Sequence, residues 1–452
     1  MEVGPPRLNV DGAGTDTDTV PWRLTSLPIR APTLLAALLT TLALYGAALP
    51  SPADAARRTF GPAPSSTPRL LRFKLEQIDP RDVRSARLYT AGGATSIRRA
   101  VVRKAIATGV LKIRRSRRQA RSDRSRAPRR SGRPKLVIRI RRAGRGALTP
   151  ISGRTYYVSA GGSDANSGRS RRAAWRTVRR VNTASLDAGD GVLFEGGRSF
   201  SDSALSPQRS GSARRPIVYG SYGSRQARLP EGVYLLDVSG LAVQNLEVSG
   251  AGQAVLASAS GEASDITIER MTISDAAIAI NSASDKDAGW TIRDNTISNI
   301  GDSGMILNGS SFSITGNSIV KTGIDGSIGY PKHGIYLKVV DARVRHNTIR
   351  GFQTSGVSVR YRNSVIEHND IGDGRFGLAW HQYDPAAGTS QWRYNTISRT
   401  TVAGIYVSPE DIAGPTRESF VITNNMLSKR SGVYSDLEPT RGAYTVKANR
   451  ER

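Results

Sequence analysis

Residues 291–320 read TIRDNTISNIGDSGMILNGSSFSITGNSIV, and this stretch contains the pattern that decides the fold. An apolar residue, Ile292, is followed three positions later by Asn295, and Gly304-Met305 then opens a short run of alternating apolar and polar residues. The asparagine returns at Asn317 before the stretch ends. A unit that recurs in this way is typical of a repeat protein.

The same unit continues to the end of the chain. The asparagine recurs 22 to 30 residues apart, at Asn295, Asn317, Asn347, Asn369, Asn395 and Asn425. The units contain short alternating runs and no segment of helical length, which excludes βαβ units and favours coils of short strands stacked about 4.8 Å apart. We expect each asparagine to take a left-handed backbone conformation at a sharp bend and to hydrogen-bond to its copies along the stack.

With these repeats, the chain resembles the right-handed parallel β-helix proteins of the pectate-lyase-like superfamily, in particular its secreted members. The opening motifs Tyr156-Tyr157-Val158-Ser159 and Trp175-Arg176-Thr177-Val178 resemble their N-terminal cap. Trp175, Val178 and Val181 fall near one helical face and predict a short helix over the open end of the coil. The resemblance implies an all-β fold, a right-handed parallel β-helix solenoid over residues 151–452. Its superfamily includes lyases, hydrolases, epimerases and inactive binding proteins, so the fold alone does not name a reaction.

The chain of 452 residues has no cysteine, which excludes disulfides and metal sites built on thiolates. Its net charge of +28 is concentrated in one segment, because residues 56–150 contain 28 Lys and Arg against 4 Asp and Glu. We interpret 56–150 as a basic, partly disordered linker with a possible small β module, indicated by alternating runs at 70–76, 86–89 and 135–140.

Residues 1–55 are expected to direct export. The uncharged run 31–49 is preceded by Arg23 and Arg30 and followed by Pro50, and Ala53 and Ala55 fit a signal-peptidase site. A retained membrane anchor is the alternative, because an uncharged run of 19 residues nearly spans a bilayer. Either reading places the β-helix outside the cytoplasm, as a secreted or cell-surface protein.

The basic run within residues 114–145 has two readings. It could tether the protein to an anionic envelope polymer or lipid, or it could be a solvated linker. Nucleic acid is a less favoured partner, because residues 114–133 contain no aromatic side chain for base stacking. The sequence does not indicate an oligomeric state.

Candidate site residues follow from strand alternation in Gly334-Ile335-Tyr336-Leu337-Lys338. Ile335 and Leu337 are expected to point inward, and Tyr336 and Lys338 outward. Carried along the stack, this register predicts one outward column of Asn308, Lys338, Arg360, His381 and Ser408. It predicts a second column of Ile306, Tyr336, Ser358, Ala379 and Tyr406.

This stripe suits an acidic polysaccharide as partner. Arg neutralises carboxylates, while Tyr336 and Tyr406 offer flat faces to sugar rings. Elimination at a uronate needs a base, a group that neutralises the carboxylate and an acid for the leaving oxygen. Lys338 or His381 is the candidate base and Arg360 the neutralising group, and Lys338 with Arg360 resembles the pair of chondroitinase-B-type and alginate lyases.

A longer turn, residues 322–332, is expected to bring Asp325, Tyr330 and His333 close to Lys338 as further substrate-binding residues. No cofactor is indicated, and calcium has no convincing site. His346 and His368 precede neighbouring asparagines and are interpreted as turn-edge residues that stack on each other, with metal binding as the alternative.

Three hypotheses follow. The first is an exported polysaccharide-interacting protein that acts as a lyase on uronate-containing glycan. The second is a non-catalytic glycan-binding or structural module at the cell surface or envelope. The third is a nucleic-acid binder through residues 114–145.

Overall fold

The computed structural model describes residues 147–451 with short gaps, of which 258–259, 327–329, 409, 429–432 and 436–443 are examples, and separate strands between 57 and 140. The predicted signal or anchor at 1–55 and most of the basic run 114–145 lie outside the described residues. No helix in the described part has the length and apolar character needed to cross a membrane.

Strands occur at each of the three alternating runs of the basic segment. They are β1 (Arg57–Phe60), β2 (Leu70–Lys74), β3 (Val83–Thr90), β4 (Gly93–Ile97), β5 (Val110–Arg114) and β6 (Lys135–Ile140). β1, β6, β3 and β4 pair antiparallel in that order, and β2 pairs with β5. The division of the chain at 56 and 150 stays a prediction.

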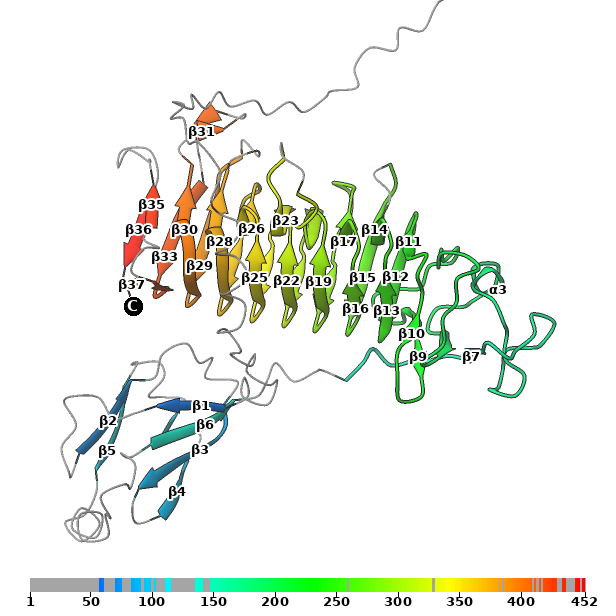
Figure 1. Cartoon of the computed structure of the whole chain (residues 1–452), viewed down its shortest axis with the longest axis horizontal. Coiled ribbons are helices and arrows are strands. Elements are labelled where there is room, and N and C mark those ends of the chain that lie inside the picture. Colours follow the sequence, from blue (N-terminus) through cyan, green and yellow to red (C-terminus); the bar gives the residue numbers. More distant parts are fainter. Residues whose placement is uncertain are drawn as a thin grey trace, which may run out of the picture. The chain divides into compact units, whose positions relative to one another are not determined.

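From residue 155 onward the chain forms a parallel β-solenoid with three faces (Figure 1). The first face contains β10 (Ala227–Arg228), β13 (Leu246–Ser249), β16 (Thr272–Ser274), β19 (Thr296–Ile300), β22 (Ser318–Thr322), β25 (Thr348–Phe352), the first parts of β28 (Asp370–Trp380) and β30 (Thr396–Val407), β34 (Met426–Leu427) and β37 (Arg450–Glu451). The second face contains β11 (Val233–Leu235), β14 (Gln253–Ala257), β17 (Ile278–Ser282), β20 (Met305–Ser310), β23 (His333–Val340), β26 (Ser355–Val359), the last parts of β28 and β30, and β35 (Val433–Ser435).

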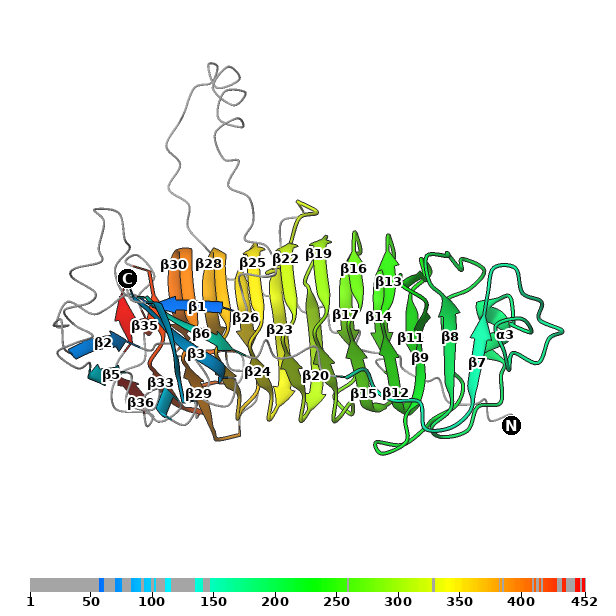
Figure 2. The same cartoon turned by 90° about the horizontal axis from the view of Figure 1, so that it is seen from below.

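The third face is a separate twelve-stranded sheet. It contains β7 (Thr155–Val158), β8 (Gly191–Glu195), β9 (Ile217–Tyr222), β12 (Val238–Gln244), β15 (Ala263–Glu269), β18 (Thr291–Arg293), β21 (Ser313–Thr315), β24 (Arg343–Arg345), β27 (Val365–Glu367), β29 (Gly388–Arg393), β33 (Glu418–Thr423) and β36 (Tyr444–Lys447). Two short strands, β31 (Glu410–Asp411) and β32 (Gly414–Pro415), pair with each other outside these faces. Figure 2 shows the strands of successive coils side by side along the solenoid. The predicted parallel solenoid is therefore confirmed.

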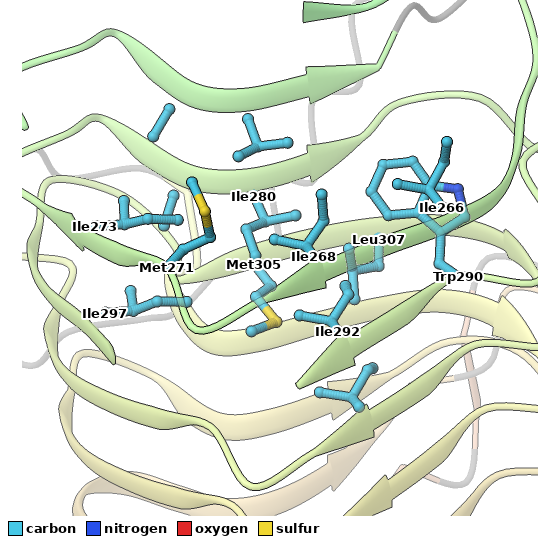
Figure 3. Close-up of a cluster of buried hydrophobic side chains, with 14 of the residues drawn as sticks. Ile266, Ile268, Met271, Ile273, Ile280, Trp290, Ile292, Ile297, Met305 and Leu307 are labelled. Atoms are coloured by element: carbon cyan, nitrogen blue, oxygen red, sulfur yellow. The ribbon is translucent and has the colours of Figure 1, made fainter. Parts of the chain in front are cut away.

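The core is a continuous column of apolar side chains inside the coils. In Figure 3, Ile268, Ile292 and Leu307 point into the interior from the third and second faces, and Ile273 and Ile297 point in from the first. All five are fully buried. Alternation explains this, because each strand sends every second side chain inward and the repeats place apolar residues at those positions.

The recurrent glycine has a steric cause. A Cβ at Gly356 would lie 2.3 Å from Cγ2 of Ile371 and 2.8 Å from the carbonyl oxygen of Gly377. Gly334 has the same surroundings one coil earlier, with Ile349 and Gly356 as neighbours. Since a backbone carbonyl cannot move aside as a side chain can, only glycine fits this column.

The asparagine ladder is confirmed, with one correction. Asn347 accepts hydrogen bonds from the backbone N–H and the Nδ2 of Asn317, both at 2.9 Å, and its own Nδ2 donates to Oδ1 of Asn369 at 3.0 Å. The left-handed conformation, however, belongs to the residue before each asparagine, such as His346 with φ of 55°. The side chain of the asparagine itself is buried in the core. There its amide accepts a hydrogen bond from one neighbouring asparagine and donates one to the next. We call the row of left-handed residues the ledge. It comprises Asn245, Arg270, Asp294, Gly316, His346, His368, Tyr394 and Asn424.

The predicted capping helix is present as α3 (Val178–Asn182), which lies at the β7 end of the solenoid (Figure 1). Val178 and Val181 are buried, and Thr177 caps the helix by accepting a hydrogen bond from the N–H of Arg180. Trp175 precedes the helix and stacks on Tyr156 with ring centroids 4.8 Å apart.

Candidate functional site

Three polar side chains predicted to form a stripe do occupy neighbouring coils. Lys338 lies on β23 beside Asn308 of β20. Arg360 follows β26 and donates its N–H to the carbonyl of Leu337 at 2.8 Å, and His381 follows β28 and donates to Val359 at 3.1 Å. We call Lys338, Arg360 and His381 the cationic stripe. Its register follows from β23, β26 and β28 pairing in parallel without a shift between them.

Aromatic rings surround the cationic stripe. The Arg360 guanidinium lies 5.4 Å from the centre of the Tyr336 ring, and the Lys338 ammonium lies 5.5 Å from the same ring. The Lys338 ammonium also lies 5.1 Å from the ring of Tyr383. Each of these is a cation–π distance, so both charges rest on ring faces.

Tyr383 was not among the predicted site residues, and neither was Tyr361, whose ring stacks on it at 6.1 Å. Both follow the ends of strands, where strand alternation no longer assigns a direction. Tyr383 continues the stack nevertheless, since its N–H donates to the carbonyl of Arg360 at 3.1 Å. The sequence signal that could have identified these two tyrosines is their position, one residue after Arg360 and two residues after His381.

The second predicted column is in register but unevenly exposed. Tyr336 pairs with Ser358, Ser358 with Ala379 and Ala379 with Tyr406. Ser358 and Ala379 have no exposed surface, whereas Tyr336 and Tyr406 are half-exposed. The Tyr406 ring lies 5.4 Å from that of His381.

Two histidines, His381 in the stripe and His333 next to it, are held neutral. Burial, and after it the charge of Arg360, lowers the pKa of His381 from 6.5 to about 4. Burial lowers the pKa of His333 to about 3, with Arg360 and His381 adding to the effect. The cause is physical, since an imidazolium cannot be hydrated there and already faces a cation. His333 lies under the stripe with 4% of its surface exposed and stacks on Tyr336 at 5.1 Å.

These shifts predict acid sensitivity of the fold. Below pH 6.5 the unfolded chain takes up a proton at residue 333 and the native protein does not, so the free energy of unfolding falls as pH falls. For His333 the loss is about 2 kcal/mol between pH 6.5 and pH 5. His333→Phe keeps a ring against Tyr336 and removes the titration. Urea unfolding at pH 7, 6 and 5 should show a shallower loss for this variant, and parallel curves would contradict the prediction.

The longer turn connects the end of β22 at Thr322 to the start of β23 at His333. Asp325 forms an ion pair with Lys332, which is buried. This ion pair closes the turn on itself. Tyr330 is 70% exposed. Residues 327–329 between them lie outside the described part.

The histidines of the ledge stack as predicted. The rings of His346 and His368 lie 5.2 Å apart at 15°, and Tyr394 continues the stack at 5.1 Å from His368. Beside it Glu367 binds Arg345 at 3.0 Å and Arg393 at 2.8 Å, and these bonds help to lower its pKa against the effect of burial. Across the described residues, no group of three or more His, Asp or Glu side chains is placed to hold a metal ion.

A cleft that the sequence did not indicate lies on the first coils, away from the cationic stripe. It encloses about 600 Å³. Its lining comprises Gly197, Arg198, Ser199, Ser224, Arg225, Gln226, Arg228, Asn245, Glu247, Arg270, Met271, Thr272, Asp294 and Thr296. These residues come from five separate stretches, so no local motif marks them.

The repeat architecture has a match among known families. The family described as right handed beta helix region matches residues 177–319 and 276–446, which together make up more than half of the chain. The chain belongs to this family. Its β-helix is therefore right-handed, as the resemblance implied.

Individual proteins match this chain over a shorter stretch or at a lower sequence identity. A lacto-N-biosidase of Bifidobacterium longum subsp. longum is 42% identical over 88 residues, which are 19% of this chain and 6% of that protein. The chain thus spans a small part of that relative. Among solved structures, a GH136 lacto-N-biosidase from Eubacterium ramulus has a TM-score of 0.48 at 15% identity over 66% of this chain and 68% of that one. A pectate lyase has a TM-score of 0.37 at 11% identity over 66% and 79%. Similarity at this level does not assign the activity of these proteins to this chain.

Proposed function

We propose that this right-handed β-helix binds an acidic polysaccharide along the cationic stripe and acts on it as a uronate lyase. The observation that carries the proposal is the placement of Lys338, Arg360 and His381 on successive coils, between Tyr336 and Tyr406. Coil spacing of about 4.8 Å is close to the length of one pyranose unit, so a glycan laid along the axis meets one stripe residue per sugar. The 88-residue match to a lacto-N-biosidase supports a carbohydrate ligand.

Binding would use two kinds of contact. The Arg360 guanidinium can hold a uronate carboxylate with two parallel N–H···O bonds, which a lysine ammonium cannot do. Tyr406 can stack on the apolar face of a sugar ring, whereas the Tyr336 ring is already in contact with His333 and Arg360. Tyr336 already supports Arg360 at 5.4 Å, so the guanidinium is held before the ligand arrives.

Elimination would use His381 as base. With a pKa of about 4 its imidazole is neutral at pH 7 and can accept the C5 proton. The electrons of the C5–H bond then form the C4–C5 double bond, the C4–O bond breaks, and the leaving oxygen takes a proton from an acid. Arg360 stabilises the charge that develops on the carboxylate. The hydroxyl of Tyr406, on the ring next to His381, is our candidate acid.

A non-catalytic glycan-binding module is the second candidate, and one observation favours it. The Lys338 ammonium lies between the rings of Tyr336 and Tyr383, at 5.5 and 5.1 Å. Two ring faces hold the ammonium in place, which suits electrostatic contact with an anionic glycan.

One assay separates the two candidates. The protein is incubated with alginate, pectate and glycosaminoglycans, and the ultraviolet absorbance of the unsaturated product is followed. A lyase gives product from at least one substrate. A binding module gives none, yet is retained on an immobilised glycan, and Lys338→Ala weakens this retention about tenfold through loss of a charged contact. Absence of both product and binding contradicts the proposal.

We also propose export, on the basis of residues 1–55. Mass spectrometry of the protein recovered from its native host would show cleavage after Ala55, or an intact N-terminus in the membrane fraction. Recovery from the cytoplasm would contradict export.

A further inference from the structure

The cleft of the first coils has a floor built from the ledge. Asn245, Arg270 and Asp294 are three consecutive ledge residues, with φ of 52°, 51° and 58°. The left-handed conformation turns these side chains outward at the corner where the third face passes into the first. Beside them, Glu247 and Thr272 stand on β13 and β16, which pair in parallel.

The wall of the cleft is joined to this floor by hydrogen bonds. It consists of the turn 197–199 after β8 and the segment 224–228 after β9. The Gly197 N–H donates to the carbonyl of Gln226 at 2.7 Å, and Nε2 of Gln226 donates to the carbonyl of Arg270 at 2.7 Å. Arg228 on β10 binds Glu247 on the neighbouring strand β13 at 2.9 Å. Wall and floor are therefore held in a fixed relation before any ligand binds, which lowers the entropic cost of binding.

The chemistry of the lining is that of a site for hydroxyl and carboxylate groups. Apart from Gly197 and Met271, every lining residue has a polar side chain, so the cleft offers both hydrogen-bond donors and acceptors. Four of these residues are arginines and two are carboxylates, which leaves an excess of positive charge. Within the described part of the chain, no ion pair involves the exposed Arg225, whereas Arg198 binds Glu195 at 3.4 Å.

We propose that this cleft is a second carbohydrate site, which binds an acidic oligosaccharide. A volume of about 600 Å³ is in the usual range for ligand sites. A uronate carboxylate would meet Arg225 and Arg270, and the sugar hydroxyls would meet Asn245, Thr272 and Asp294. The site is independent of the cationic stripe, which begins after β22, and the two are tested separately.

The test uses the full chain with Lys338→Ala and Arg360→Gln, so that the cationic stripe no longer binds. Trigalacturonate and trimannuronate are titrated into it by calorimetry, and maltotriose serves as the neutral probe. We expect at least one acidic probe to bind, its affinity to fall with added salt, and maltotriose to bind much more weakly. Adding Arg225→Gln or Arg270→Gln should weaken the acidic probe about tenfold.

Arg209→Gln is the matched control, because Arg209 is exposed and does not line the cleft. It should leave the affinity unchanged. Arg225 is exposed as well, so its variant should melt at the wild-type temperature and report binding alone. The proposal is overturned if neither acidic probe binds, if maltotriose binds equally well, or if Arg225→Gln and Arg270→Gln bind as the parent does. If the wild-type protein shows no lyase activity or glycan binding at the cationic stripe, the titrations of the stripe variant are unaffected. Failure of the proposed function can therefore be told apart from failure of the cleft proposal.

Discussion

His381→Gln is expected to lower kcat/KM for uronate elimination about 10³-fold, because glutamine fills a similar space and cannot accept the C5 proton. Binding should change little, since Arg360 and the tyrosines that hold the glycan stay in place. The measurement is the initial rate of unsaturated product formation, with KM determined alongside kcat. A fall in kcat at nearly constant KM identifies a group that acts in the transition state.

The matched control for this variant is Asn308→Leu. Asn308 faces outward in the same column as Lys338, one coil earlier, and has no group that titrates. Its replacement should leave kcat close to the wild-type value. If His381→Gln retains full activity while Lys338→Ala loses it, the assignment of His381 as the base is wrong. Lys338 is then the base.

Asn347→Leu is expected to lower the free energy of unfolding by about 4 kcal/mol. The substitution removes the acceptor for two donors of Asn317 and the donor for the carbonyl of Ile314 and Oδ1 of Asn369. These groups are buried in the core, where water does not replace the lost partner. Urea unfolding at pH 7 measures the effect.

Asn308→Leu again serves as the comparison. Its Nδ2 donates to the carbonyl of Ser282 at 2.7 Å, but the side chain is partly exposed, so we expect a loss of about 1 kcal/mol. Equal losses for the two variants would show that the ladder contributes no more than a surface hydrogen bond. A larger loss for Asn347→Leu with an unchanged m-value assigns the effect to the native ladder.

The repeat pattern predicted the register of the cationic stripe. Alternation assigned Ile335 inward and Lys338 outward, and the spacing of the glycines aligned Arg360 and His381 with it. The same reasoning was wrong about the left-handed position. It assigned that conformation to the asparagine, whereas His346 and its equivalents adopt it. A pattern of residue types shows that a bend exists and does not show which of two adjacent residues makes it.

The cleft and the contacts of Tyr383 could not be predicted from the sequence, because both depend on the conformation of turns. Arg198, Arg225 and Arg270 belong to different coils and to turns of unequal length. Tyr383 follows a strand, where the period of two no longer applies. Turn conformations are set by contacts with neighbouring coils, and a single sequence has no periodic signal for them.

The sequence by itself determined the stacking of coils, the inward and outward faces and the neighbours of each strand residue, because a strand's side-chain period is local and the repeats copy it from coil to coil. Only the tertiary structure decided that His333 is buried and His381 half-buried beside Arg360, where the pKa of each is lowered, and that ledge and wall enclose a cleft. Burial and charge at a given atom depend on groups brought from other coils, and their distances exist only once the chain is wound.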